Sequence, residues 1–163
     1  MEKDYSWDFI DSYFKNNKQC LVKHHIESYN DFFERGIKNI FKEKNPVKIM
    51  KTQDPNTKEF KNTCELYFGG LNGDKLYYGK PVIYDETRTH IMYPNEARVR
   101  NMTYGFTIHY DVDVIFKIIN GVGELIETKI TLEKIYLGRF PIMLQSNLCI
   151  LNGLTPELRF NMG

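Results

Sequence analysis

Residues 106–118 show the pattern that most constrains the fold. Every second residue is apolar, and the residues between them are mostly polar or charged. The apolar set is Phe106, Ile108, Tyr110, Val112, Val114, Phe116 and Ile118, and the other set is Thr107, His109, Asp111, Asp113 and Lys117. Because strand side chains point to opposite faces in turn, this alternation predicts a long β-strand with one face in a core.

Turn residues on either side of this strand predict hairpins. The sequence NGVG at residues 120–123 contains glycines, which adopt positive φ at little cost, so residues 124–137 should return as the antiparallel partner. Earlier in the chain, residues 65–68 and 75–78 flank the glycine-rich stretch 69–74. This arrangement predicts a second hairpin with a longer loop.

The first third of the chain has helical spacing. Apolar residues recur at steps of three and four from Val22 to Ile40, which predicts a helix over about 21–44 that ends at Asn45-Pro46. A shorter helix precedes it, with Ser6 as its expected N-cap. A third, very short helix should begin at Pro94. We therefore predict one α+β domain over residues 1–163, with two N-terminal helices packed on an antiparallel sheet that contains a long hairpin.

Composition excludes several classes of protein. The chain of 163 residues is 42% hydrophobic, which is too apolar for a disordered segment. No apolar run approaches the roughly 18 residues that span a bilayer, so we expect no membrane association. The three cysteines are far apart and odd in number, which indicates a reducing compartment rather than a disulfide framework. The net charge of +1 gives no global argument for a partner.

No complete catalytic motif is present in the sequence. It lacks a phosphate-binding loop, a nucleophile elbow and a dinucleotide fingerprint, so binding or assembly fits better than an autonomous enzyme. His109, Asp111 and Asp113 share one strand face and could hold a divalent metal for a hydrolase. We favour the simpler interpretation, a solvated strand face, and expect no metal site.

Basic residues are concentrated in two places. Residues 35–61 carry eight basic and three acidic residues, a local charge of +5. Lysines there could contact phosphates, although a soluble surface is the alternative. Arg98 and Arg100 could bind phosphates or carboxylates through their guanidinium groups. The alternative is a structural role, in an ion pair with Glu96 or with a neighbouring subunit.

Four blocks of the sequence resemble one known family. Residues 93–104, YPNEARVRNMTY, resemble the YPxEARLRNLTY segment of the second-largest subunit of eukaryotic-type multisubunit DNA-directed RNA polymerase. Residues 134–146, KIYLGRFPIMLQS, resemble its GRLPIMLRS stretch, with Gln145 in place of the usual arginine. Residues 21–32 resemble its GLV…SFN helix, and the FNMG at residues 160–163 resembles the start of its FDMGGYFIING segment. The blocks occur in the family's order.

The resemblance implies that the chain is the N-terminal part of the protrusion domain, beside the cleft for DNA and the RNA–DNA hybrid. It implies no catalytic residue and no cofactor here, because the family holds its Mg²⁺ mainly in an aspartate loop of the largest subunit. The expected partners are the largest and other polymerase subunits, template DNA, the RNA–DNA hybrid and initiation factors. Candidate DNA or factor contacts are Arg98, Arg100, Arg139, Lys38, Lys42, Lys48 and Lys51.

Two further expectations concern context. The abrupt end at Gly163 suggests a subunit that continues beyond it, whereas the alternative is a free-standing binding module derived from the protrusion. The resemblance places the protein in the nucleus if it is eukaryotic, and in the virion or a cytoplasmic viral factory of the host if it is viral.

Overall fold

The computed structural model describes residues 5–17, 19–53, 55–56, 58, 60–120 and 123–152, and it confirms the α+β class with an antiparallel sheet. Its helices are α1 (Ser6–Asn16), α2 (Lys23–Asp31), α3 (Ile37–Lys44) and α4 (Pro94–Val99), with a π-helical turn η1 (Phe32–Gly36) and a 3₁₀ turn η2 (Ile150–Asn152). Its strands are β1 (Val47–Gln53), β2 (Phe60–Phe68), β3 (Leu76–Tyr78), β4 (Val82–Tyr84), β5 (Thr89–Ile91), β6 (Gly105–Ile119) and β7 (Leu125–Pro141).

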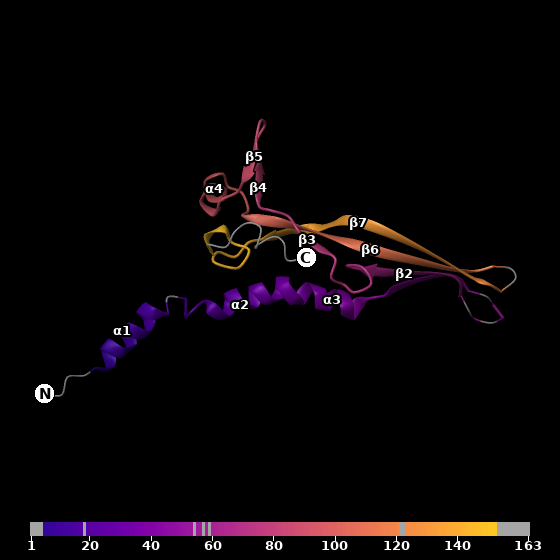
Figure 1. Cartoon of the computed structure of the whole chain (residues 1–163), viewed down its shortest axis with the longest axis horizontal. Coiled ribbons are helices and arrows are strands. Elements are labelled where there is room, and N and C mark those ends of the chain that lie inside the picture. Colours follow the sequence, from indigo (N-terminus) through magenta and orange to yellow (C-terminus); the bar gives the residue numbers. More distant parts are fainter. Residues whose placement is uncertain are drawn as a thin grey trace.

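The long hairpin is the largest feature of the sheet. Strands β6 and β7 pair antiparallel from Ile119 opposite Leu125 to Gly105 opposite Pro141, as the alternation and the turn residues predict. The register shifts between Ile108 and His109 and again between Tyr110 and Val112. Figure 1 shows the two strands as one extended ribbon.

The second predicted hairpin is wrong. Strands β2 and β3 do not reverse against each other but follow each other along the same edge of β6, facing its residues 112–118 and 108–110. Residues 69–74 form a loop between β2 and β3, after which the chain continues along the same edge of β6. The Gly69 and Gly70 amides both donate to the Asp111 carbonyl, at 2.8 and 3.2 Å, and the Asp111 amide donates to the Lys75 carbonyl at 3.3 Å. Gly69 and Gly70 have φ of +71° and +74°, so the glycines serve this loop and not a chain reversal.

The predicted helix at 21–44 is confirmed as one helical segment, α2–η1–α3. Its inward side chains, Tyr29, Phe33, Ile37 and Phe41, recur at every fourth residue. In an α-helix each step of four overshoots a full turn by about 40°. The wider π turn holds more residues per turn, which keeps the stripe on one side. The Phe33 ring packs against Phe106 of β6 and Phe140 of β7, with centroid distances of 5.3 and 5.8 Å.

Two tyrosine hydroxyls anchor this helix to the sheet. Tyr78 of β3 donates to the Phe33 carbonyl at 2.6 Å, and Tyr29 of α2 donates to the Pro141 carbonyl at 2.7 Å. Burial raises the pKa of both phenols to about 12, so both remain protonated donors at neutral pH.

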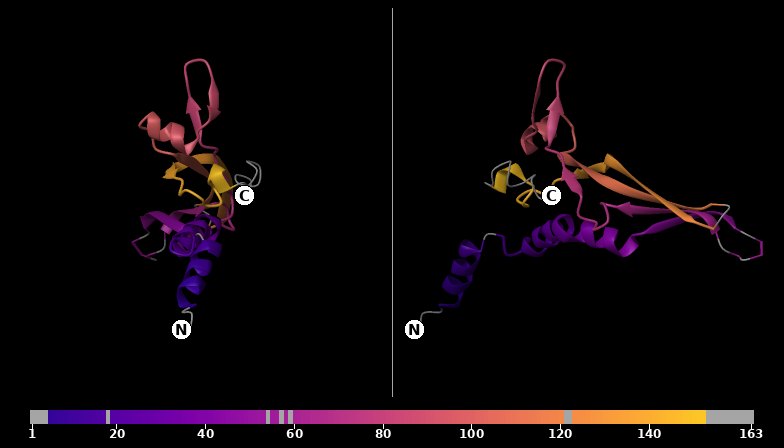
Figure 2. Two further views of the ribbon diagram at one scale, coloured as in Figure 1. Left: turned by 90° about the vertical axis from the view of Figure 1, so that its left-hand side faces the viewer. Right: turned by 45° about the vertical axis from the view of Figure 1, so that its right-hand side comes forward.

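The first helix differs from the prediction. No residue of α1 is buried, and the side chains of Trp7 and Phe9 are 73% and 81% exposed. Its N-cap is Tyr5 rather than Ser6, without a side-chain hydrogen bond. Figures 1 and 2 show α1 projecting away from the sheet. Only one of the two N-terminal helical segments therefore packs on the sheet, because only α2–η1–α3 has its apolar stripe opposite strand residues.

A second, smaller core supports the hairpin of β4 and β5. The buried side chains of Ile83, Met92 and Ala97 meet here, with Tyr104 packed against them. Figure 2 shows β4–β5 rising from the sheet beside α4. The helix α4 begins at Pro94, as predicted. Among the described residues, no helix is long and apolar enough to cross a bilayer.

The unequal packing of the helices leads to a stability prediction. Replacing Phe33 with Ala should lower the free energy of unfolding by about 3–5 kcal/mol, because a buried ring with several ring neighbours is removed. Replacing Phe9 with Ala on α1 should change it by less than about 0.5 kcal/mol. Urea titration followed by circular dichroism measures both, and equal decreases for the two variants would contradict this packing.

Candidate nucleic-acid interface

The structure separates the seven predicted basic residues into two groups. Arg98 and Arg100 lie at α4, and Arg139 lies near the end of β7. Lys38 and Lys42 lie on α3, and Lys48 and Lys51 lie on β1. Figure 1 shows α4 beside the β4–β5 hairpin and α3 on the opposite side of the sheet. The candidates therefore do not form one continuous surface.

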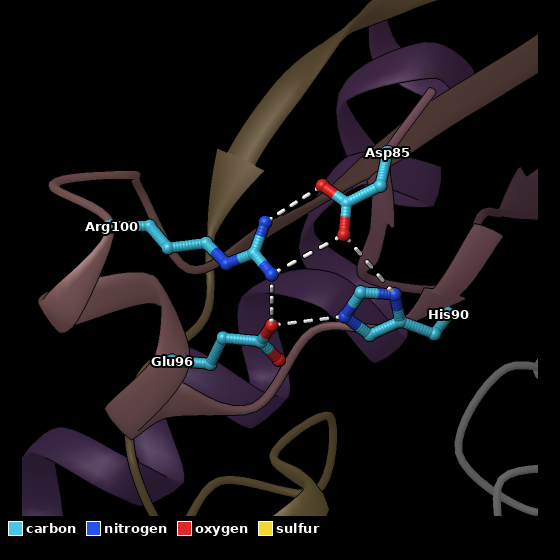
Figure 3. A network of polar contacts seen from close by, with 4 residues as sticks. All are labelled: Asp85, His90, Glu96 and Arg100. Atoms are coloured by element: carbon cyan, nitrogen blue, oxygen red, sulfur yellow. Dashed lines mark hydrogen bonds and ion pairs between the residues drawn. The ribbon is translucent and has the colours of Figure 1, made fainter. Parts of the chain in front are cut away.

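Arg100 is held inside a network of four side chains (Figure 3). Its Nη1 lies 2.7 Å from Asp85 Oδ1, and its Nη2 lies 3.3 Å from Asp85 Oδ2 and 3.1 Å from Glu96 Oε1. His90 Nε2 is 2.9 Å from the same Glu96 oxygen, and His90 Nδ1 is 4.0 Å from Asp85 Oδ2. The network joins the β4–β5 hairpin to α4.

The Arg100 guanidinium shifts the pKa values in this network because it contacts the carboxylates of both Asp85 and Glu96. Hydrogen bonds from Arg100 hold the pKa of Asp85 below its ordinary value, and Asp85 in turn raises the pKa of Arg100. The ion pair with Glu96, one of the alternatives that the sequence offers, is present. A phosphate would have to compete with two carboxylates for this arginine.

Arg98 and Arg139 have no carboxylate partner among the described residues. Arg98 Nη2 is 3.2 Å from Asn95 Oδ1, and Arg98 borders a hollow of about 340 Å³ whose apolar lining includes Tyr93, Leu144 and Leu151. Arg139 Nη2 donates to the Thr103 carbonyl at 2.9 Å. The same Nη2 also lies 4.0 Å from Met92 Sδ, so within the described structure the Nη1 and Nε groups are the ones available to a ligand.

The four lysines also differ. Lys48 Nζ lies 3.4 Å from Glu65 Oε1, and Lys117 Nζ lies 2.9 Å from Glu65 Oε2. The hydrogen bond from Lys117 is the main cause of the lowered pKa of Glu65. Within the described part of the chain, Lys38, Lys42 and Lys51 have no carboxylate within ion-pair distance. These three lysines are the ones that remain available to phosphates.

The solvated strand face predicted for Asp111 and Asp113 is wrong. Their exposed fractions are 5% and 2%. Asp111 accepts from the Tyr77 hydroxyl at 2.9 Å and from the Lys134 amide at 2.9 Å, within the irregular part of the β6–β7 register. These donors come from β3 and β7, so strand pairing buries the carboxylate.

The Asp113 carboxylate, like that of Asp111, has two partners on neighbouring elements. Thr131 Oγ1 donates to it at 2.7 Å, and Lys129 Nζ lies 3.1 Å away. Burial opposes its charge, but these two groups outweigh the burial and lower its pKa. His109 instead contacts the ring of Tyr136. The described residues contain no cluster of three or more His, Cys, Asp or Glu that could hold a metal ion.

Sequence reasoning missed Asp85 and His90. Asp85 lies fifteen residues before Arg100, on the far side of a short hairpin and a loop. No local periodicity connects the two positions. Only the Glu96–Arg100 pair, four residues apart on a helix, carried a signal in the sequence.

Comparisons with known proteins identify relatives of this chain. A family model described as RNA polymerase beta subunit matches residues 20–162. DNA-directed RNA polymerase II subunit RPB2 of Encephalitozoon cuniculi is 28% identical over 163 residues, which are 99% of this chain and 13% of that protein. DNA-directed RNA polymerase subunit Rpo2N of Methanothermobacter thermautotrophicus is 33% identical over 155 residues, which are 94% of this chain and 25% of that protein. The chain thus spans about a quarter or less of these relatives' length.

The Arg100 network predicts a pH dependence. Because the folded pKa of Asp85 is lowered, its ion pair contributes stability above the ordinary carboxyl pKa of about 3.9, and that contribution disappears as the pH falls through the lowered pKa. Replacing Arg100 with Gln should return the Asp85 pKa toward about 3.9. An NMR titration of the Asp85 carboxyl carbon measures this shift. An Arg98→Gln control should leave the titration of Asp85 unchanged, and an unshifted Asp85 in the Arg100 variant would refute the pairing.

Proposed function

The chain belongs to the RNA polymerase beta subunit family, and on this premise we propose that it works as the N-terminal protrusion part of a second-largest subunit in DNA-directed RNA polymerase. The observation that carries the proposal is the family match over residues 20–162, together with relatives named as polymerase subunits that align with nearly the whole chain. This match favours a polymerase subunit over a free-standing binding module.

In this proposal the chain positions nucleic acid and takes no part in bond formation. Nucleotidyl transfer belongs to the assembled enzyme, and its Mg²⁺ is held outside residues 1–163. The fold suits a wall of the cleft because the β6–β7 ribbon is long, is paired from end to end apart from two register shifts, and is braced by α2–η1–α3 at one end. A braced ribbon can hold contact residues at fixed positions without further ordering cost.

The available lysines support a contact with the DNA backbone. Lys38 and Lys42 are four residues apart on α3, so both side chains lie on one side of the helix. Lysine contacts phosphates without reading bases, which is what a subunit that serves many templates requires.

The α4 surface supports a protein contact. The hollow beside Arg98 is lined mainly by apolar residues, which favours another polymerase subunit or an initiation factor over phosphate. We further propose the largest subunit, template DNA and the RNA–DNA hybrid as partners of the assembly. The compartment is the nucleus for a eukaryotic source and the virion or a cytoplasmic viral factory for a viral one.

The salt dependence of template binding tests the lysine contact. In polymerase reconstituted with the double variant Lys38→Ala/Lys42→Ala, template affinity should fall. The slope of log affinity against log salt should become less steep by about 0.9 for each phosphate that the variant no longer neutralises. Fluorescence anisotropy with labelled promoter DNA over a range of salt concentrations measures both quantities.

The matched control is Lys15→Ala/Lys23→Ala, which makes the same charge change on helices where both lysines already pair with Asp11 and Glu27. This control should keep the original slope. Equal slopes for the two double variants would refute the role of the α3 lysines.

A further inference from the structure

A groove lies where the β4–β5 hairpin leaves the main sheet. Its volume is about 380 Å³, and segments from four parts of the chain line it: the residues after β3, strand β4, the start of β6 with the loop before it, and the end of β7. Figure 2 shows these elements converging at the base of the hairpin. The groove is separate from the Arg98 hollow and from the α3 lysines.

The walls of this groove are fixed by close backbone packing. A Cβ atom at Gly79 would lie 2.2 Å from Thr107 Oγ1, and one at Gly105 would lie 2.6 Å from the Phe140 carbonyl oxygen. The Gly79 amide also donates to the Thr107 carbonyl at 2.8 Å. At Gly105 only glycine lets the two backbones approach this closely, and at Gly79 the missing Cβ leaves room for the Thr107 side chain, so the chain's own packing sets the groove walls.

The charge of the groove is positive. Lys80 and Arg139 line it, and no acidic side chain does. Neither cation has a carboxylate within ion-pair distance in the described part of the chain. Arg139 Nη2 donates to the Thr103 carbonyl and lies 4.0 Å from Met92 Sδ, which orients the guanidinium and leaves its Nη1 and Nε donors available. The complementary ligand is therefore an anion.

The remaining lining favours a ligand with a flat apolar part. Tyr84 of β4 lines the groove with its side chain 78% exposed, and Met102 lines it with 38% exposed. An exposed aromatic ring beside unpaired cations is the combination by which proteins hold single-stranded nucleic acid: bases stack on the ring and phosphates meet the cations. An acidic peptide would bind the two cations and leave the Tyr84 ring unused. A nucleic-acid duplex would also leave the ring unused, because its bases are stacked on each other inside the helix.

We propose that this groove binds single-stranded nucleic acid, with phosphates on Lys80 and Arg139 and one base stacked on Tyr84. The inference deepens the proposed function, on which it rests for the presence of unpaired DNA or RNA. It assigns that strand to the base of the β4–β5 hairpin rather than to α3.

Binding of a labelled oligonucleotide tests the proposal. Fluorescence anisotropy with a ten-nucleotide oligothymidine should show binding by the purified chain, with an unlabelled duplex of equal length competing poorly. Tyr84→Ala should weaken binding about 5- to 100-fold because the base can no longer stack. Lys80→Ala should weaken it and make the salt slope less steep by about 0.7.

The matched controls are Tyr13→Ala and Lys15→Ala, which remove the same residue types from the exposed face of α1. Both controls should bind like the wild type. The proposal is overturned if wild-type chain does not bind, if the groove variants match these controls, if the duplex competes equally, or if an acidic peptide displaces the oligonucleotide without sensitivity to Tyr84→Ala.

Failure of the proposed function has a different signature. In that case the tagged wild-type chain would not assemble with other polymerase subunits, whatever its affinity for the oligonucleotide. If the Tyr84→Ala variant assembles normally with the other polymerase subunits and binds the oligonucleotide as the wild type does, only the proposal for the groove is overturned.

Discussion

The packing of Phe33 against the sheet is the interaction on which most of this structure depends. Its ring packs against the rings of Phe106 and Phe140, and its carbonyl accepts a hydrogen bond from the Tyr78 hydroxyl. One helical residue therefore joins β3, β6 and β7. The π turn that contains Phe33 keeps the apolar stripe directed at the strands over the full length of the helix. Without this packing the long ribbon would be ordered only by strand pairing, between β6 and β7 and with β2 and β3 along the other edge of β6.

The charged residues divide into those that hold the fold and those that remain free to bind. Arg100 joins a hairpin to a helix, and Lys48 shares Glu65 with Lys117. Asp111 and Asp113 are buried with complete sets of donors. Lys38, Lys42 and Lys80 form no ion pair with the other described residues, so binding a ligand through them would not cost the fold such an interaction. This division supports a positioning function better than the number of basic residues does.

Besides the hollow beside Arg98, exposed apolar side chains gather on two other parts of the described structure. The helix α1 presents Trp7 and Phe9, and the far part of the sheet presents Ile49, Ile118 and Ile126 with 47–54% of each exposed. Monomeric proteins rarely expose apolar patches of this kind, whereas parts of larger assemblies do so where neighbouring polypeptide covers them. Both surfaces are consistent with a module of a multisubunit enzyme.

The sequence by itself determined the elements whose signals are local. Alternation at a period of two predicted β6 and its partner β7, spacing of three and four predicted α2–η1–α3, and Pro94 predicted the start of α4. The glycines at 69–73 marked a turn, but a local signal does not say whether the chain reverses or rejoins the same strand edge, and only pairing with β6 decided that. The burial of Asp111 and the bond between Asp85 and Arg100 were likewise decided by the tertiary structure, because each joins segments distant in sequence that meet only when the sheet forms.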